Sequence, residues 1–223
     1  MEGIGHQVYE YVQEINFAKV VFDFRICSLF LFMRKAIFLD RDGTINYDVG
    51  YLSKIKDIII FEGVISSLKS FKESGFLNLI ITNQSGVARG YFTETDLNKL
   101  HEEFKNLLCS NGLELIDDIF FSPFHIEGRI QEYTKESNTR KPGIGMIEEA
   151  AKKYYIDLSK SYFIGDSLAD MQCAENAGIK KVLVKTGYGL STIEKCREKN
   201  IKIDFIANGL FDASEYIINN EKS

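Results

Sequence analysis

Short apolar runs alternate with amphipathic stretches along the chain from Arg34 onward. Six runs are rich in β-branched or aromatic residues and are apolar almost throughout, which is typical of strands covered on both faces. They are residues 36–39, 77–82, 118–122, 161–165, 181–185 and 203–207. Segments 64–75 and 93–112 carry apolar residues at helical spacing, and each ends in a glycine, so they predict helices. The second opens with Thr-Glu-Thr-Asp, which suits an N-cap and first turn. This alternation predicts an α/β fold with a doubly wound, mostly parallel sheet.

The first 33 residues follow a different pattern. Segment 15–33 is apolar, but three charged residues interrupt it, so no 18-residue uncharged run is available to span a bilayer. A secretory signal begins with basic residues and ends in a small-residue cleavage site, whereas the first 33 residues carry an acidic residue at position 2 and end in Phe-Met. We therefore predict an N-terminal extension over 1–33 and one globular domain over 34–223. The extension is interpreted as a packing or interaction element, as a weak interfacial anchor, or as sequence upstream of a natural start at Met33.

Composition narrows the possible partners. The chain has 223 residues, 45% of them hydrophobic, enough for one domain with a full-sized core. A net charge of -5 argues against a nucleic-acid partner or a polybasic membrane surface. The four cysteines form no Cys-x-x-Cys pair, so neither a disulfide framework nor a thiolate zinc site is indicated. We expect a protein of the reducing cytoplasm.

Polar side chains gather where the predicted strands end. Asp40 and Asp42 follow the first strand, 82–85 close the second, and Asp166 follows a later one, while Arg140 and Lys141 precede a helix. The carboxyl ends of parallel strands meet at one edge of a sheet, so we expect these groups to converge there. Clustered carboxylates repel one another, and Mg²⁺ relieves that repulsion while also binding phosphate oxygens. The pattern indicates phosphoryl transfer.

Each of these residues has a predicted role. Asp40 attacks phosphorus and forms an aspartyl phosphate, and Asp42 acts as general acid and then as general base. Thr82 and Lys141 stabilise the transferring phosphoryl oxygens. Asp40 and Asp166 ligate Mg²⁺.

The motifs DRDGT, ITNQS, RKP and GDSLAD resemble the four ordered motifs of the haloacid dehalogenase-like phosphohydrolases. The longer stretches FLDRDGTINYDVGYL and TNQSGVARGYFTE resemble the capless branch of that family, which acts on small phosphorylated metabolites. The similarity covers about residues 34–189. It implies a Mg²⁺-dependent phosphatase on a capless, Rossmann-like sheet, with Asp40, the main-chain carbonyl of Asp42, and Asp166 as metal ligands.

The resemblance also implies a substrate. We expect removal of the 7-phosphate from D-glycero-D-manno-heptose 1,7-bisphosphate, in the biosynthesis of nucleotide-activated heptose, with histidinol phosphate as the alternative. We expect no nucleic-acid or membrane partner. An open, capless site fits a monomer, and a dimer contact through the apolar N-terminal segment is the alternative. The implied substrate contacts are Asp48, Val49, Gly50, Tyr51, Thr82, Asn83, Gln84, Ser85, Arg140 and Lys141.

Two departures from the family pattern bear on these expectations. Many members of the branch hold a structural zinc ion with three cysteines and a histidine. The matching positions here are Ser122, Phe124, Ser137 and Thr139, with only His125 beside them. One histidine cannot replace four ligands, so we expect no zinc and a loop ordered by Phe124 and Tyr133. The second departure is a serine at position 167, where a substrate-binding lysine is common.

Several residues have plainer interpretations. His101 lies in the charged stretch LHEEFK and is predicted to be a solvated surface residue, while His125 is predicted to be a loop hydrogen-bonder. Asp170 either supports the metal site or favours a helix N-terminus. The Gly-Tyr-Gly turn at 187–189 is predicted to be scaffold.

Two alternatives to an enzyme remain open from sequence alone. A receiver-like phosphoacceptor module shares the strand-end aspartate, Mg²⁺ and lysine, but no Asp-x-Asp follows its first strand. A catalytically silent relative is disfavoured by the complete set of predicted catalytic residues.

Overall fold

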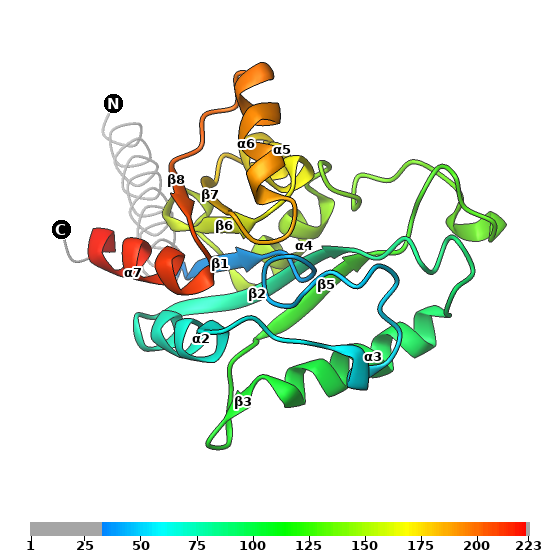
Figure 1. Cartoon of the computed structure of the whole chain (residues 1–223), viewed down its shortest axis with the longest axis horizontal. Helices are drawn as coiled ribbons and strands as arrows, with labels where there is room; N and C mark the ends of the chain where they lie inside the picture. The colour runs from blue at the N-terminus through cyan, green and yellow to red at the C-terminus, as the bar shows by residue number, and fades with distance from the viewer. Residues whose placement is uncertain (1–32, 222–223) are drawn as a thin grey trace, which may run out of the picture. The chain divides into compact units, whose positions relative to one another are not determined.

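The computed structural model of the chain describes residues 33–221 (Figure 1). The predicted extension lies outside the described residues except for Met33, and so do the hypotheses of a packing element, an anchor or an internal start. Within the described part, no helix is long and apolar enough to cross a membrane.

Six parallel strands form one sheet in the order β5-β2-β1-β6-β7-β8. The predicted α/β fold is confirmed, and each predicted strand is found to within two residues at either end. The strands are β1 (Lys35–Leu39), β2 (Phe76–Asn83), β5 (Asp118–Ser122), β6 (Tyr162–Gly165), β7 (Lys180–Val184) and β8 (Phe205–Ala207). Because β1 lies centrally and its side chains are almost wholly buried, its run of apolar residues is explained by cover on both faces.

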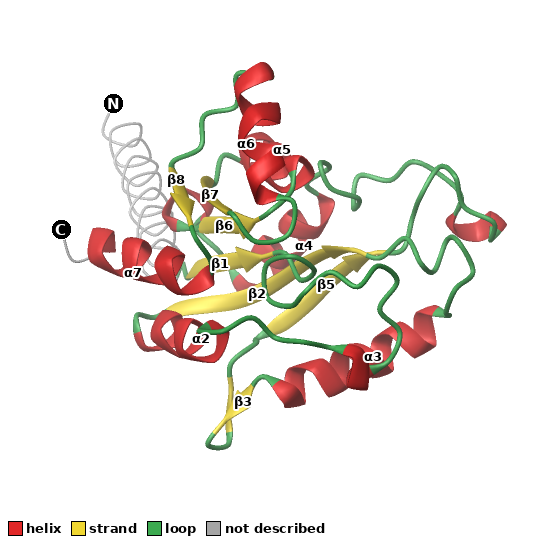
Figure 2. Cartoon of the chain, viewed as in Figure 1, coloured by secondary structure: helices red, strands yellow, loops and turns green. Residues whose placement is uncertain are grey.

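Helices cover both faces of the sheet (Figures 1 and 2). Ile37 and Leu39 of β1 pack into one core with α2, α3 and α7, whereas Ala36 and Phe38 pack into another with α4 and α5. Helix α6 covers β7 together with α5. The helices are α2 (Val64–Glu73), α3 (Glu94–Leu107), α4 (Gly145–Tyr154), α5 (Leu168–Ala177), α6 (Gly189–Glu198) and α7 (Leu210–Glu221). Three 3₁₀ turns are η1 (Ile55–Asp57), η2 (Gln131–Tyr133) and η3 (Leu158–Lys160).

The predicted helix over 93–112 is correct at its start and wrong at its end. Thr93 caps α3 in a capping box with Asp96, as its first residues predict. The helix ends at Leu107, and β3 (Cys109–Ser110) pairs antiparallel with β4 (Leu113–Glu114). The two residues between these strands, Asn111 and Gly112, have φ values of 50° and 77°. An Asn-Gly pair favours this left-handed two-residue hairpin, so local turn chemistry outweighs the helical spacing.

The order of the strands places the functional site. The chain runs outward from β1 to β2 and β5, then returns to β6 on the other side of β1. Such a switch leaves a crevice at the carboxyl ends of β1 and β6. Asp40 and Asp166 directly follow these two strands, so both aspartates face one crevice.

Candidate active site

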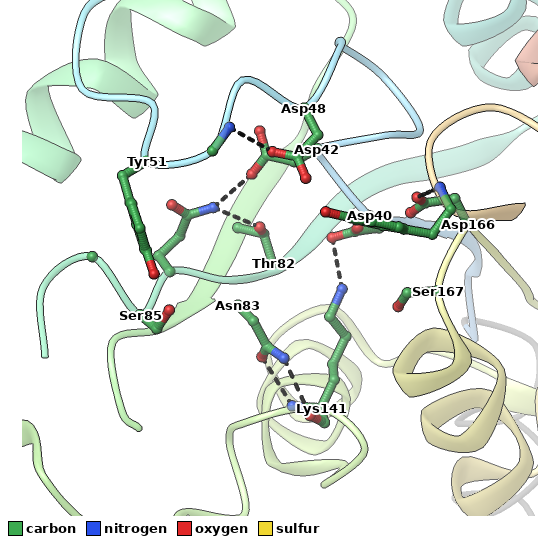
Figure 3. Close-up of a pocket in the computed structure, with 14 residues that line it drawn as sticks. Asp40, Asp42, Asp48, Tyr51, Thr82, Asn83, Ser85, Lys141, Asp166 and Ser167 are labelled. Carbon is green, nitrogen blue, oxygen red and sulfur yellow. Dashed lines mark hydrogen bonds and ion pairs between the residues drawn. The ribbon is translucent and has the colours of Figure 1, made fainter. Parts of the chain in front are cut away.

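A pocket of about 350 Å³ opens at the carboxyl ends of the strands (Figure 3). Most of the predicted site residues line it, together with Gly86, Ser167 and Tyr188. These predicted residues are Asp40, Asp42, Asp48, Gly50, Tyr51, Thr82, Asn83, Gln84, Ser85, Lys141 and Asp166. Val49 and Arg140 are not among its lining residues. Arg140 instead donates to the main-chain oxygen of Phe124 at 3.1 Å and lines a neighbouring cavity that shares Lys141.

Lys141 is the buried cation of the pocket, with 4% of its surface exposed. Its Nζ lies 2.6 Å from a carboxylate oxygen of Asp40 and 2.6 Å from one of Asp170. It also donates to the main-chain oxygen of Ile81 at 2.8 Å. Burial alone would lower the pKa of Lys141, but the charges of Asp170 and Asp40 outweigh burial and raise it. The ammonium is therefore held charged against Asp40.

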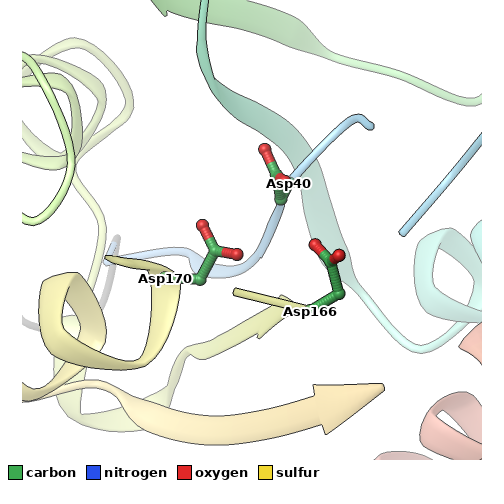
Figure 4. Close-up of side chains that lie close together, drawn as sticks. All are labelled: Asp40, Asp166 and Asp170. Atoms are coloured by element: carbon green, nitrogen blue, oxygen red, sulfur yellow. The ribbon is translucent and has the colours of Figure 1, made fainter. Parts of the chain in front are cut away.

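Three buried carboxylates form an acidic cluster, in which one oxygen from each of Asp40, Asp166 and Asp170 lies within 4.8 Å of the others (Figure 4). Burial, followed by the charge of Asp170, raises the pKa of Asp166 to about 7. Burial also raises the pKa of Asp40, although Lys141 opposes the shift. A divalent cation would relieve both effects, so the oxygen donors fit Mg²⁺.

Asp170 starts helix α5 and also pairs with Lys141 beside the acidic cluster. One of its oxygens pairs with Lys141, and the other accepts from the main-chain N–H of Ser167 at 2.9 Å and from its hydroxyl at 2.6 Å. This capping box begins α5 directly after Asp166. With both oxygens of Asp170 engaged, the cluster leaves Asp40 and Asp166 as the carboxylates that can hold a metal ion.

Two glycines let the main chain approach Asp166 closely. A Cβ at Gly43 would lie 2.3 Å from Oδ2 of Asp166, and one at Gly187 would lie 2.0 Å from the same atom. The main-chain N–H of Tyr188 donates to that oxygen at 2.7 Å. The turn predicted to be scaffold supports Asp166, and its Tyr188 also lines the pocket. The turn follows the carboxyl end of β7, and residues after strand ends are the ones expected to line the site.

Asp42 is held by a bidentate contact from its neighbour. Arg41 is 1% exposed, and its Nη2 and Nε donate to the Asp42 carboxylate at 2.7 and 3.2 Å. Asn46 and Gln84 each donate to the same carboxylate at 3.0 Å. Burial would raise the pKa of Asp42, but Arg41 and these amides outweigh it and lower the pKa. Asp42 is thus ionised in this arrangement.

His101 supports Arg41, and its predicted place on the solvated surface is wrong. It is 4% exposed, and its Nε2 lies 3.2 Å from Nη1 of Arg41. Arginine only donates, so this nitrogen accepts and the imidazole is neutral. Burial, and then the charge of Arg41, lower the pKa of His101 to about 3. His101 lies four residues after buried Leu97 and three before buried Phe104, a helical spacing that marks the covered face.

Three of the four positions that the family pattern matches to zinc ligands, Ser122, Ser137 and Thr139, carry hydroxyls that bond to one another. Thr139 Oγ1 lies 3.2 Å from Oγ of Ser122 and 2.8 Å from Oγ of Ser137. The rings of Phe124 and Tyr133 are in contact, with centroids 6.0 Å apart. His125 accepts at Nδ1 from the main-chain N–H of Glu127, the loop hydrogen bond that the sequence predicts.

Comparison of the sequence with known proteins shows which family the chain belongs to. Residues 138–213 match a family model described as HAD-hydrolase-like. The chain is 41% identical over 185 residues to the D-glycero-beta-D-manno-heptose-1,7-bisphosphate 7-phosphatase of Haemophilus ducreyi, covering 82% of this chain and 98% of that protein. The chain belongs to the haloacid dehalogenase-like phosphatases. The family predicted from the motifs is confirmed, and the receiver-like alternative is set aside.

A second relative and a solved structure also match the chain over most of its length. A relative in Photorhabdus laumondii, named for the alpha anomer of the heptose bisphosphate, is 40% identical over 184 residues, covering 82% of this chain and 96% of the relative. The crystal structure of D,D-heptose 1,7-bisphosphate phosphatase from B. bronchiseptica, complexed with magnesium and phosphate, superposes with a TM-score of 0.72. It is 29% identical in sequence, and the match covers 83% of this chain and 99% of that one.

Proposed function

We propose that this phosphatase hydrolyses the 7-phosphate of D-glycero-D-manno-heptose 1,7-bisphosphate through an aspartyl phosphate on Asp40. The observation that carries the chemistry is the contact between Asp40 and buried Lys141, 2.6 Å apart, beside Asp166 in an open pocket. The substrate is supported by relatives near 40% identity that are named for it.

In the first step, a carboxylate oxygen of Asp40 attacks phosphorus and the bond to the sugar oxygen breaks. Lys141 and the hydroxyl of Thr82 stabilise the charge on the phosphoryl oxygens, and Lys141 also fixes the orientation of the nucleophile. Asp40, Asp166 and the main-chain carbonyl of Asp42 are the groups that would hold Mg²⁺. When bound, that ion neutralises phosphoryl charge and orients the substrate.

Asp42 moves the protons. It protonates the leaving sugar oxygen in the first step, and in the second it takes a proton from the water that attacks the aspartyl phosphate. That attack breaks the bond between phosphorus and Asp40, which releases phosphate and restores the carboxylate. The hydrogen bonds from Arg41 and Gln84 keep Asp42 ionised and support the base role. The negative charge of an incoming phosphate favours its protonation for the acid role.

The substitution Asp40→Asn tests the nucleophile. We expect release of phosphate to fall by at least about a thousandfold, because the amide cannot form the covalent intermediate. The matched control is Asp57→Asn, at an exposed aspartate in η1 outside the residues that line the pocket. Phosphate release near the wild-type rate from a folded Asp40→Asn protein would contradict the role of Asp40.

A panel of substrates tests the assignment of the heptose. We expect kcat/KM to be higher for at least one anomer of heptose 1,7-bisphosphate than for histidinol phosphate. Relatives named for the beta and alpha anomers have similar identity to this chain, so both anomers belong in the panel. A higher kcat/KM for histidinol phosphate than for either anomer would overturn the proposed substrate.

We also propose that residues 34–223 are the phosphatase domain and that it acts as a monomer in the cytoplasm. In the described part of the chain, Cys109, Cys173 and Cys196 are free thiols, which suits a reducing compartment. Residues of this one chain line the open pocket, which is compatible with a monomer. Light scattering of the purified chain tests the monomer, and an apparent mass near twice that of the chain would contradict it.

A further inference from the structure

The turn at 186–188 is fixed against the acidic cluster. The hydroxyl of Thr186 donates to the main-chain oxygen of Gly43 at 2.6 Å, and the main-chain N–H of Tyr188 donates to Asp166 at 2.7 Å. Gly187 between them has a φ of 55° and leaves no room for a Cβ beside Asp166. The main chain that carries Tyr188 is therefore positioned by the same contacts that position the candidate metal ligand.

Tyr188 lies near Asp48 at the catalytic pocket. Both residues line the catalytic pocket, and both also line a second cavity of about 460 Å³ beside it. Asp48 is itself held, because one of its oxygens accepts from the main-chain N–H of Gly50 at 2.8 Å. The charge of Asp48, and then a hydrogen bond to it, raise the pKa of the Tyr188 hydroxyl. Tyr188 and Asp48 are shared by the linings of the two cavities and therefore lie between them.

The charges around the pocket indicate which part of a substrate lies against Tyr188 and Asp48. The charged side chains that line the pocket are four aspartates and Lys141, and Lys141 is already paired with two carboxylates. A second phosphate beside Asp48 would face a carboxylate with no free cation among the lining residues, which is unfavourable. Sugar hydroxyls can donate to Asp48, and the C–H face of a sugar can pack on the tyrosine ring.

We propose that Tyr188 and Asp48 form a substrate-binding wall that recognises the hydroxyl-bearing carbon chain of the sugar and excludes its second phosphate. The proposal rests on the proposed sugar-phosphatase function. Tyr51 lines the far side of the pocket from Asp166 and Ser167 (Figure 3). Its ring is backed by Tyr91, with centroids 4.3 Å apart. The sugar chain would then lie between two aromatic side chains.

The test compares Tyr188→Ala and Tyr188→Phe on two substrates, heptose 1,7-bisphosphate and propyl phosphate. For the heptose, we expect Tyr188→Ala to raise KM by about tenfold through lost ring packing. We expect Tyr188→Phe to raise it by about threefold through the lost hydroxyl contact. In both variants kcat should stay within about twofold of wild type, because the wall binds ground state and transition state alike. Propyl phosphate has no hydroxyls along its chain, so Tyr188→Phe should hydrolyse it with wild-type kcat/KM, and Tyr188→Ala should lose less on it than on the heptose.

Leu190→Ala is the matched control, because Leu190 is 67% exposed in the same segment and does not line the pocket. An unchanged KM for the heptose in Tyr188→Ala would overturn the proposal. An equal loss on both substrates would also overturn it, because it would show that the variant had only displaced Asp166. If wild-type protein fails to hydrolyse the heptose bisphosphate while it hydrolyses propyl phosphate, the proposed substrate fails instead.

Discussion

His101 should make the folded protein sensitive to acid. In the folded state its pKa is lowered to about 3, because the imidazole is buried and accepts a hydrogen bond from Arg41. In the unfolded chain the same group titrates near its ordinary value of about 6.5. Below that pH the unfolded chain binds a proton that the folded state does not, so acid favours unfolding. This contribution is negligible above about pH 7.5, grows as the pH falls, and levels off below about pH 3.

The size of the effect follows from the two pKa values. Each pH unit between them lowers the free energy of unfolding by about 1.4 kcal/mol. At pH 5 the contribution of His101 is therefore about 2 kcal/mol, and at pH 6 it is about 0.8 kcal/mol. Asp40 and Asp166 have raised pKa values and act in the opposite direction, so the wild-type profile alone mixes these effects. A comparison with a variant that lacks only the imidazole separates them.

The assay is urea unfolding of wild type and His101→Gln between pH 5 and pH 8, without divalent cations. Glutamine keeps an oxygen that can accept from Arg41 and does not titrate. We expect the free energy of unfolding of wild type, relative to the variant, to fall by about 2 kcal/mol between pH 8 and pH 5. His125→Gln is the comparison. Burial, and then the charges of Arg140 and Arg89, also lower the pKa of His125, but this imidazole is less buried than His101, so its removal should change the profile less. Parallel profiles for wild type and His101→Gln would refute the argument that His101 is buried as a neutral acceptor.

Three further predictions concern the acidic cluster. Lys141→Met should lower kcat by at least about a hundredfold and the free energy of unfolding by about 3 kcal/mol, because Asp40 and Asp170 lose their buried partner. Phosphate release and urea unfolding measure these two losses. Gly187→Ala should weaken Mg²⁺ binding by at least about tenfold, measured by calorimetry, because its Cβ would meet Asp166 at 2.0 Å. In wild type, Mg²⁺ affinity should fall as the pH drops below about 7, since a proton on Asp166 then competes with the ion.

Each of these predictions has a control and an outcome that contradicts it. Lys199→Met removes an exposed lysine and should change neither activity nor stability, whereas an active, stable Lys141→Met protein would disprove the role of that lysine. Gly209→Ala adds a methyl group whose nearest neighbour is 3.9 Å away and should leave Mg²⁺ affinity unchanged. Equal Mg²⁺ affinity in Gly187→Ala and Gly209→Ala would contradict the prediction that the close approach of Gly187 to Asp166 matters for Mg²⁺ binding. A Mg²⁺ affinity independent of pH from 6 to 8 would contradict the raised pKa of Asp166.

Local turn chemistry and helical spacing override other sequence patterns at particular places in the chain. The Asn111-Gly112 pair predicts the hairpin that ends α3, although helical spacing suggested that the helix continued. The spacing from Leu97 to His101 and Phe104 places His101 on the covered face, although its charged neighbours suggested solvent. Tyr188 follows a strand end, the place where the other site residues were found. At the hairpin, turn chemistry outweighs helical spacing, and at His101 helical spacing outweighs the charge of the neighbouring residues.

The sequence by itself determined the architecture and the reaction class. Apolar runs at strand length specify a sheet covered on both faces. Carboxylates at the ends of parallel strands gather at one edge, so the sequence alone predicts that Asp40, Asp42 and Asp166 line one pocket. Tertiary structure alone decided which partners these carboxylates meet. Lys141 lies between Asp40 and Asp170, and Tyr188 meets Asp48, because distant loops approach each other only after the sheet has formed. Burial and nearby charge, which depend on that packing, then set the pKa values.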